Sequence, residues 1–172
     1  VYRHRWELVR ARQQRGDLDG VERHRNDALA IHRKIDNRLG EANDLGNLGT
    51  VYADHGDLAR TEQHYRDALT IHRQIDNRVG QARALGNLGL VYADQGDLAR
   101  IEQHFDGAIA MDREIGNRIG EASVLGDLGI VAAELGQQEE ACRLFREVDA
   151  IYEQTGAGGE GPEDVRANLK EL

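Results

Sequence analysis

Residues 31–58 read IHRKIDNRLGEANDLGNLGTVYADHGDL, and residues 71–98 read IHRQIDNRVGQARALGNLGLVYADQGDL. The two segments are variants of one sequence, and residues 16–55 and 56–95 are identical at 26 of 40 positions. The Gly-Asp-Leu element that begins each of these units returns in degraded form as Gly136-Gln137-Gln138. Self-similarity at one period is the signature of a repeat architecture, so we expect an array of four units.

Each unit contains two stretches with helical periodicity. In the first stretch, large apolar residues recur three or four positions apart, which places them on one face of a helix. These residues are Leu45, Leu48, Val51 and Tyr52, then Leu85, Leu88, Val91 and Tyr92. The second stretch carries another apolar face, formed by Leu58, Tyr65, Ala68, Leu69 and Ile75. We therefore expect every unit to be a pair of helices.

Short polar residues and glycines mark the ends of these helices. Asn and Asp side chains accept hydrogen bonds from the free N–H groups of a first helical turn, and glycine adopts the left-handed conformation that ends a helix. The predicted N-caps are Asn37, Asn77, Asn117, Asp57 and Asp97. Gly56 and Gly96 are predicted to end first helices. Turns of about two residues then join antiparallel helices.

The first helices hold an excess of glycine. Each glycine costs about 1 kcal/mol relative to alanine inside a helix, so the missing side chains need an explanation. Close approach of the paired helix is expected at Gly49, Gly89 and Gly129. Two alternatives stay open three residues earlier, at Gly46, Gly86 and Gly126: helix packing, or the low floor of a ligand groove.

Composition excludes several classes of function. The 172-residue chain holds 31 Asp and Glu against 22 Lys and Arg, and its net charge of -9 disfavours binding to nucleic acid. Cys142 is the single cysteine, so neither an internal disulfide nor a cysteine-based metal site can form. No apolar run approaches the length of a signal peptide or a membrane span. We expect a cytoplasmic protein that binds no membrane.

A more specific pattern runs through the units. In the second unit, it consists of Leu48-Gly49, Tyr52, Gly56, Tyr65 and Ala68. The next unit repeats it as Leu88-Gly89, Tyr92, Gly96, Phe105 and Ala108, and the last matches less well, with Leu128-Gly129, Ala132, Gly136, Ala141 and Phe145. This pattern resembles the tetratricopeptide repeat (TPR). The 40-residue spacing and the GNLG element resemble its long-repeat subgroup of Pins/LGN adaptors, kinesin light chains and the C-terminal arrays of bacterial STAND regulators.

The resemblance implies an all-α fold, a right-handed α-solenoid of antiparallel helix pairs known as the TPR superhelix, with four repeats plus a C-terminal capping helix. The four TPR-like helix pairs of residues 1–155 would be an atypical N-terminal unit at 1–37 and units at 38–77, 78–117 and 118–155. A Gly-rich linker at 156–162 and the capping helix at 163–172 would follow, the latter with Val165, Leu169 and Leu172 at helical spacing.

In such a solenoid the first helices line a concave face, and the resemblance implies that an extended peptide binds there. The inward positions are Asn43, Asn47, Thr50, Asp54, Arg83, Asn87, Leu90, Asp94, Ser123, Asp127, Ile130 and Glu134. In Pins/LGN-like arrays, the Asn of GNLG bonds the peptide main chain and the Arg before it pairs with peptide acids. Asn47, Asn87 and Arg83 match those positions, whereas Ser123 and Asp127 do not.

The residue types at these positions favour a ligand but leave alternatives open. An Asn amide offers donors and an acceptor together, as a peptide bond requires, although Asn is a poor helix former. Asn47 and Asn87 therefore contact a ligand or bond neighbouring helices to set the stacking of repeats. Asp54, Asp94 and Glu134 form an acidic row in last helical turns, where negative charge is unfavourable. This row indicates a ligand with basic residues, or a solvated face.

The sequence shows no catalytic or cofactor-binding constellation. It contains no GxxxxGK[ST], G-x-S-x-G or HExxH element. Histidines recur at equivalent positions, but eight residues of one helix, about 12 Å, separate His64 from His72, too far for them to share an ion. We expect structural roles for these histidines, a packing role for Cys142, no metal, no cofactor and no enzymatic activity.

The first fifteen residues differ in charge from the rest of the chain. They hold five Arg against one Glu, a net charge of +4 that leaves -13 on the remainder. This asymmetry motivates two alternative hypotheses: salt-sensitive head-to-tail self-association, or contact of the basic segment with an upstream domain. Sedimentation at low and high salt would test the self-association. The sequence as a whole predicts a non-catalytic protein- or peptide-binding module, and the resemblance implies that this module is the partner-binding arm of a larger intracellular regulator. The alternative is a self-assembling scaffold with no specific groove ligand.

Overall fold

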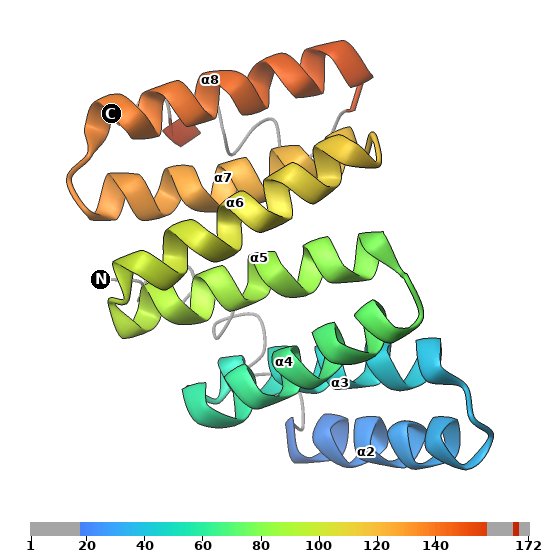
Figure 1. Cartoon of the computed structure of the whole chain (residues 1–172). Helices are drawn as coiled ribbons and strands as arrows, with labels where there is room; N and C mark the ends of the chain where they lie inside the picture. Colours follow the sequence, from blue (N-terminus) through green and yellow to red (C-terminus); the bar gives the residue numbers. More distant parts are fainter. Residues whose placement is uncertain (1–17, 158–166, 169–172) are drawn as a thin grey trace.

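A computed structural model describes residues 18–157 and 167–168 of the chain. The described part contains seven α-helices and no strand, and successive helices run in opposite directions (Figure 1). Their bounds are α2 (Leu18–Lys34), α3 (Arg38–Asp54), α4 (Leu58–Gln74), α5 (Arg78–Gln95), α6 (Leu98–Glu114), α7 (Arg118–Glu134) and α8 (Gln138–Thr155). The predicted all-α fold class is confirmed.

The predicted caps set the ends of these helices. Five side chains accept a hydrogen bond from the amide of the residue three positions on: Asn37, Asn77, Asn117, Asp57 and Asp97. Gly56 and Gly96 both take the left-handed conformation, with φ of 73°. The predicted N-caps and the predicted helix-ending glycines are therefore both confirmed.

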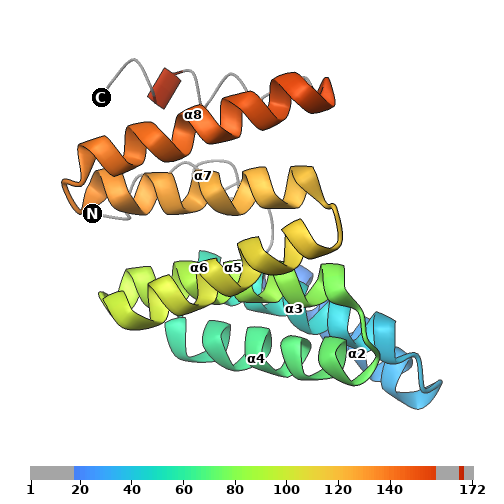
Figure 2. The same ribbon diagram turned by 45° about the horizontal axis from the view of Figure 1, so that its top comes forward.

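The helices are arranged as successive pairs. The first helices α3, α5 and α7 pack against the second helices α4, α6 and α8, respectively, and α2, α4 and α6 pack against the first helix that follows. The pairs follow one another from α2 at one end of the array to α8 at the other (Figures 1 and 2). Each unit buries its apolar face only against its neighbours, which is the organisation of an α-solenoid.

The core includes Tyr92 and Leu88 from the predicted apolar faces, together with aromatic residues of the repeat pattern. Tyr92, Phe105, Phe145, Leu88 and Leu144 are among the largest fully buried side chains. One continuous cluster of buried residues runs from α4 to α8, and a second joins α2, α3 and α4. Both clusters include residues of α4, so the apolar interior extends along the array from α2 to α8.

Close helix packing explains one row of glycines. A Cβ on Gly49 would lie 2.6 Å from the Tyr65 ring, and one on Gly129 would lie 2.8 Å from the Phe145 ring. At Gly89 the distance to the Phe105 ring would be 3.0 Å. Real Cβ atoms essentially never approach to 2.6–2.8 Å and seldom to 3.0 Å, so the absent side chain lets an aromatic ring of the paired helix lie against the first helix.

The second row of glycines is open. Among the described residues, no heavy atom lies within 4 Å of a Cβ built on Gly46 or Gly126, and one on Gly86 would make only an ordinary contact of 3.4 Å with Val124. Helix packing therefore does not require glycine at these positions. Of the two alternatives that the sequence left open, the structure disfavours packing for this row.

Several predictions concern residues outside the described ranges. These are the basic first fifteen residues, residues 158–162 of the Gly-rich linker at 156–162, and the capping helix at 163–172, of which only residues 167–168 are described, as helix. The division into units at 1–37, 38–77, 78–117 and 118–155 stays a prediction.

A buried tyrosine with a set of polar partners joins α4, α5 and α6. Tyr92 is completely buried, its hydroxyl donates to Glu62 Oε1 at 3.0 Å, and it accepts from Arg66 Nη2 at 3.0 Å. The guanidinium carbon of Arg100 lies 4.5 Å from the ring centroid, and the His104 ring centroid lies 4.7 Å away. We call these five residues the Tyr92 site.

A similar arrangement occurs one unit earlier, where Asn26 stands in place of Arg66. The Tyr52 hydroxyl donates to Glu22 Oε1 at 2.7 Å, with Arg60 4.2 Å and His64 4.8 Å from the ring centroid. Burial and the bond to Glu22 raise the pKa of Tyr52 above its usual value of 10.0. The phenol is therefore a stable neutral donor to the carboxylate at neutral pH.

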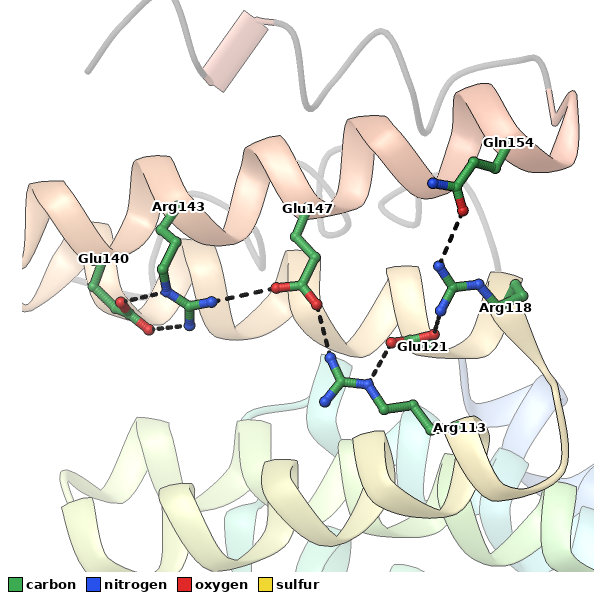
Figure 3. A network of polar contacts seen from close by, with 7 residues as sticks. All are labelled: Arg113, Arg118, Glu121, Glu140, Arg143, Glu147 and Gln154. Atoms are coloured by element: carbon green, nitrogen blue, oxygen red, sulfur yellow. Dashed lines mark hydrogen bonds and ion pairs between the residues drawn. The ribbon is translucent and has the colours of Figure 1, made fainter.

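A network of ion pairs joins α6, α7 and α8 (Figure 3). The Glu121 side chain is 1% exposed and receives hydrogen bonds from Arg118 and from Arg113 Nε, the latter at 2.6 Å. Arg113 also binds Glu147 at 2.7 Å, and Glu147 in turn binds Arg143 at 3.3 Å. Two cations thus compensate the buried carboxylate, as burial of a charge requires.

Candidate peptide-binding face

The predicted contact residues lie along the first helices α3, α5 and α7. Their exposure differs from helix to helix. The exposed residues are Asn47, Thr50, Arg83 and Ser123. The half-buried residues are Asn43, Asn87, Leu90, Asp94, Asp127, Ile130 and Glu134. Asp54 is the exception, because its side chain is buried with 5% of its surface exposed. The structure thus presents a polar surface along these helices, which we call the first-helix face.

Two of these residues contact each other across neighbouring units. The Arg83 Nη2 donates to the Asn43 Oδ1 at 3.0 Å, which joins α5 to α3. The sequence assigned both residues to a ligand but did not predict their bond. The signal was present, because the two residues occupy the same position in units 40 residues apart. A guanidinium has five N–H donors, so Arg83 keeps donors for a further acceptor.

The GNLG asparagines lie on the surface of α3 and α5. Within residues 18–157, neither Asn47 nor Asn87 makes a side-chain hydrogen bond to another residue. The alternative that these amides set the stacking of repeats therefore has no contact to support it in the described region. Each amide retains its donors and acceptor for an outside partner.

The C-terminal part of the face departs from the expected acidic row. Thr50 is exposed but shares a 3.1 Å hydrogen bond with the Tyr65 hydroxyl beneath it. Burial raises the pKa of Tyr65 above 10.0, with a smaller contribution from the negative charge of Asp54. Asp54 therefore lies beside this buried phenol rather than on a solvated surface, whereas Asp94 and Glu134 are half-buried.

Leu90 and Ile130 occupy the remaining inward positions and pack partly against the core. Each leaves part of its apolar surface accessible beside the polar residues. The face therefore combines amides, a guanidinium, carboxylates and small apolar areas, a mixture that suits a polypeptide better than a phosphate or a sugar.

The recurring histidines have structural contacts. His64 and His104 lie against Tyr52 and Tyr92, and His32 Nδ1 lies 2.6 Å from Asp44 Oδ2. His72 is 1% exposed, and burial lowers its pKa below 6.5, with a smaller contribution from the positive charge of Arg83. No group of three or more His, Cys, Asp or Glu residues in the described ranges is arranged to hold a metal ion.

Cys142 is half-buried on α8, next to the completely buried Ala141. The expected packing role of Cys142 stays a prediction. No helix in the part of the chain described by the structure is both long enough and apolar enough to cross a bilayer.

Sequence comparison with protein families matches two long segments of this chain to the Tetratricopeptide repeat, residues 3–74 and 80–154. The chain belongs to the tetratricopeptide repeat family. The match includes all three helix pairs of the described region, in which Gly49, Gly89 and Gly129 contact their aromatic partners. No curated protein sequence matches the chain significantly.

Solved structures share the fold of this TPR chain. BtubC (BKLC) from P. vanneervenii is similar with a TM-score of 0.76 and 17% identity, over 95% of this chain and 68% of that one. A Podosopora anserina protein described as a putative kinesin light chain with nearly identical TPR-like repeats has a TM-score of 0.68 at 16% identity, over 99% of this chain and 84% of that one. A point variant of that protein gives a TM-score of 0.69 with the same identity and coverage. At such identities the likeness concerns the fold.

Proposed function

We propose that the first-helix face of α3 and α5 binds an extended segment of a partner polypeptide, and that the chain is a non-catalytic interaction module. TPR arrays generally mediate interactions between proteins, and the present array offers a polar surface for that purpose. The observation that carries the proposal is the pair of GNLG amides, Asn47 and Asn87, accessible on adjacent first helices with no side-chain hydrogen bond in the described region.

The spacing of these amides fits an extended chain. The side chain of Arg83 on α5 reaches Asn43 on α3, so the two helices lie close enough for one segment to contact both. An extended polypeptide advances about 3.3–3.6 Å per residue, so a stretch of a few residues can meet Asn47 and Asn87 together. Binding through the main chain is tolerant of sequence, so side chains of the partner must supply the specificity.

The charged residues of the face favour particular side chains. Arg83 is positioned by Asn43 and suits a carboxylate of the partner. Asp94 and Asp127 lie farther along the face and favour a basic residue. The proposed ligand thus has an acidic residue near Arg83 in the first half of α5, and a basic residue near Asp94 at the C-terminal end of α5 and Asp127 on α7.

The composition of the chain favours an intracellular role. A non-catalytic module with a net charge of -9 and a single cysteine suits the reducing cytoplasm. We propose that it works there as the partner-binding arm of a larger regulatory protein, in which occupancy of the face is read by other domains.

Selection from a library of unstructured peptides tests the proposal. Peptides selected on the unmodified protein should bind the N47A/N87A double variant about 10- to 100-fold more weakly, because each amide contributes about 0.5–1.5 kcal/mol through its hydrogen bonds. The control is Asn26→Ala on α2, where the amide donates only to the Glu22 main chain. Equal affinity for the unmodified and double-variant proteins would contradict the proposal.

The scaffold alternative makes a different prediction. A self-assembling array should form salt-sensitive oligomers whose size is unaffected by changes at Asn47 and Asn87. Sedimentation at low and high salt measures this, and a monomer at both salt concentrations would exclude self-association through charge.

A further inference from the structure

A pocket of about 350 Å³ opens where α6, α7 and α8 meet. Ile101, Val131 and Leu144 contribute apolar wall, and Ala132 lies between them with 3% of its surface exposed. Three carboxylates, from Glu102, Asp106 and Glu140, and one guanidinium, from Arg143, also line the pocket. We call this concavity the Ala132 pocket. Its volume falls within the range of about 300–1,000 Å³ that ligand pockets span.

The repeat explains why the pocket exists. Forty residues earlier in the sequence, the equivalents of Ala132, Glu140, Asp106 and Leu144 are Tyr92, Arg100, Arg66 and His104, which fill the Tyr92 site. Glu102 has the same identity as its equivalent, Glu62. The pocket is therefore a Tyr92 site whose carboxylate remains and whose aromatic ring and cations have been replaced.

The two filled sites show what this shape accommodates. In each site a phenol hydroxyl donates to a glutamate, at 3.0 Å for Tyr92 and 2.7 Å for Tyr52. In each, an arginine lies over the ring, with its guanidinium carbon 4.5 Å and 4.2 Å from the centroid, respectively. An aromatic ring with a cation beside it is thus the native occupant of the equivalent space.

Charge at the pocket favours the same chemistry. Arg143 is held on α8 by Glu140 at 2.6 Å and by Glu147 at 3.3 Å (Figure 3). No ion pair of Glu102 or Asp106 occurs within the part of the chain that the structure describes. Carboxylates therefore exceed cations at the pocket, whereas Arg66 and Arg100 balance Glu62 and Asp97 at the Tyr92 site.

We propose that the Ala132 pocket binds an aromatic side chain of a partner polypeptide that has a basic residue next to it. The ring occupies the space that Tyr92 fills in its own site, its polar edge meets Glu102, and the basic side chain lies against Glu102 and Asp106. This site is separate from the first-helix face, and its occupant is recognised by side chains rather than by the main chain.

The experiment uses N-acetyl-Tyr-Arg-amide as the probe and measures its affinity by chemical-shift titration of the whole chain. Ala132→Tyr rebuilds the internal ring and should weaken binding at least tenfold. Asp106 is exposed, so Asp106→Arg introduces the positive charge of its equivalent, Arg66, without changing the core. This variant should also bind the probe at least tenfold more weakly. Glu102→Gln should weaken it about 3- to 10-fold, because a charged hydrogen-bond partner is lost.

Matched controls separate this site from other effects. Ala150→Tyr adds a tyrosine at an exposed position of α8 and should leave the affinity unchanged. The N47A/N87A variant should bind the probe as the unmodified protein does. The proposal for the pocket and the proposal for the first-helix face are therefore tested independently. N-acetyl-Leu-Arg-amide and N-acetyl-Tyr-Gln-amide should each bind at least fivefold more weakly than the probe.

Several outcomes would overturn the proposal. Equal affinity of the unmodified protein and the Asp106→Arg variant would do so, as would the absence of saturable binding at millimolar probe. A dimer in sedimentation that the Asp106→Arg variant abolishes would identify a second copy of this chain as the occupant instead.

Discussion

The Tyr92 site and the Ala132 pocket lie at equivalent places in successive repeats, yet one is filled and the other is open. Their frames agree: Gly89 meets Phe105 in one unit, and Gly129 meets Phe145 in the next. The difference comes from a few side chains at the edge of the helix pair. In this array, the residues that fix the helices are separable from the residues that decide whether the space between units is occupied.

The largest effect is expected from Tyr92→Ala. This change empties a completely buried site and removes the hydrogen bonds to Glu62 and Arg66, so the free energy of unfolding should fall by about 3–5 kcal/mol. Urea denaturation followed by circular dichroism measures the loss. Tyr92→Phe, which keeps the ring, should lose only about 1 kcal/mol. Equal losses for the two variants would mean that the ring contributes little to the site.

A change on α7 tests whether the frame around the open pocket is as tightly packed as the frame around Tyr92. A Cβ on Gly129 would lie 2.8 Å from the Phe145 ring, so Gly129→Ala should lower the free energy of unfolding by about 1–3 kcal/mol. Gly126→Ala on the same helix meets no atom within 4 Å in the described residues and should raise it by about 1 kcal/mol. Thermal melts of both variants provide the measurement, and stabilisation by both would refute tight packing at Gly129.

Filling the open pocket should stabilise the array. Ala132→Tyr adds a ring to an existing cavity beside Glu102, and the free energy of unfolding should rise by about 0.5–2 kcal/mol. Ala132→Phe supplies the ring without the hydroxyl and should give a smaller gain. A decrease for both variants in urea denaturation would show that the walls of the pocket have moved inward relative to the Tyr92 site.

A smaller change in the free energy of unfolding is expected at the N-terminus of α8, beside the pocket. Asp97 caps α6 with its side chain, whereas its equivalent, Gln137, makes no capping hydrogen bond at the start of α8. Gln137→Asp should therefore raise the free energy of unfolding by about 1 kcal/mol. Gln138→Asp, one residue into the helix, is the control and should give a smaller gain. No gain from Gln137→Asp in thermal melts would contradict the capping argument.

The same pair of positions predicts a difference in acid sensitivity. The amide of Arg100, and then its side chain, lower the pKa of Asp97 below its usual value of 3.8. The stabilisation from this carboxylate is thus complete above pH 3.8 and is lost as the pH falls toward its value in the folded protein. Asp97→Asn should flatten the acid limb of the stability curve below pH 3.8, and Gln137→Asp should steepen it there. Identical acid limbs for all three proteins in urea denaturation would contradict the assignment.

Much of the architecture was predictable because it depends on local signals that repeat. Asn37 and Asp57 act as caps through bonds to residues three positions on, and a 40-residue period is visible without any structure. The packing of Gly49 was predictable as well, since a costly residue at a fixed place in a helix needs a neighbour that benefits. Contacts within one repeat unit can therefore be predicted from the sequence of that unit.

The candidate sites were less predictable because they depend on contacts between units. The bond from Arg83 to Asn43 and the burial of Asp54 beside Tyr65 both require the separation of neighbouring helices, which sequence spacing does not provide. The Ala132 pocket was seen in the sequence only as a weaker match to the repeat pattern. Tyr52, Tyr92 and Ala132 occupy equivalent positions, so the missing aromatic ring at Ala132 is the sequence signal for a cavity.

Contact between immediate neighbours alone has an evolutionary consequence for this molecule. A gene segment encoding one 40-residue unit can be duplicated or deleted in register, and the flanking helices then meet surfaces like those they met before. Under the proposal for the Ala132 pocket, a few side chains around each added junction decide whether that junction is closed or receptive. The length of the array and its number of receptive junctions can thus change independently.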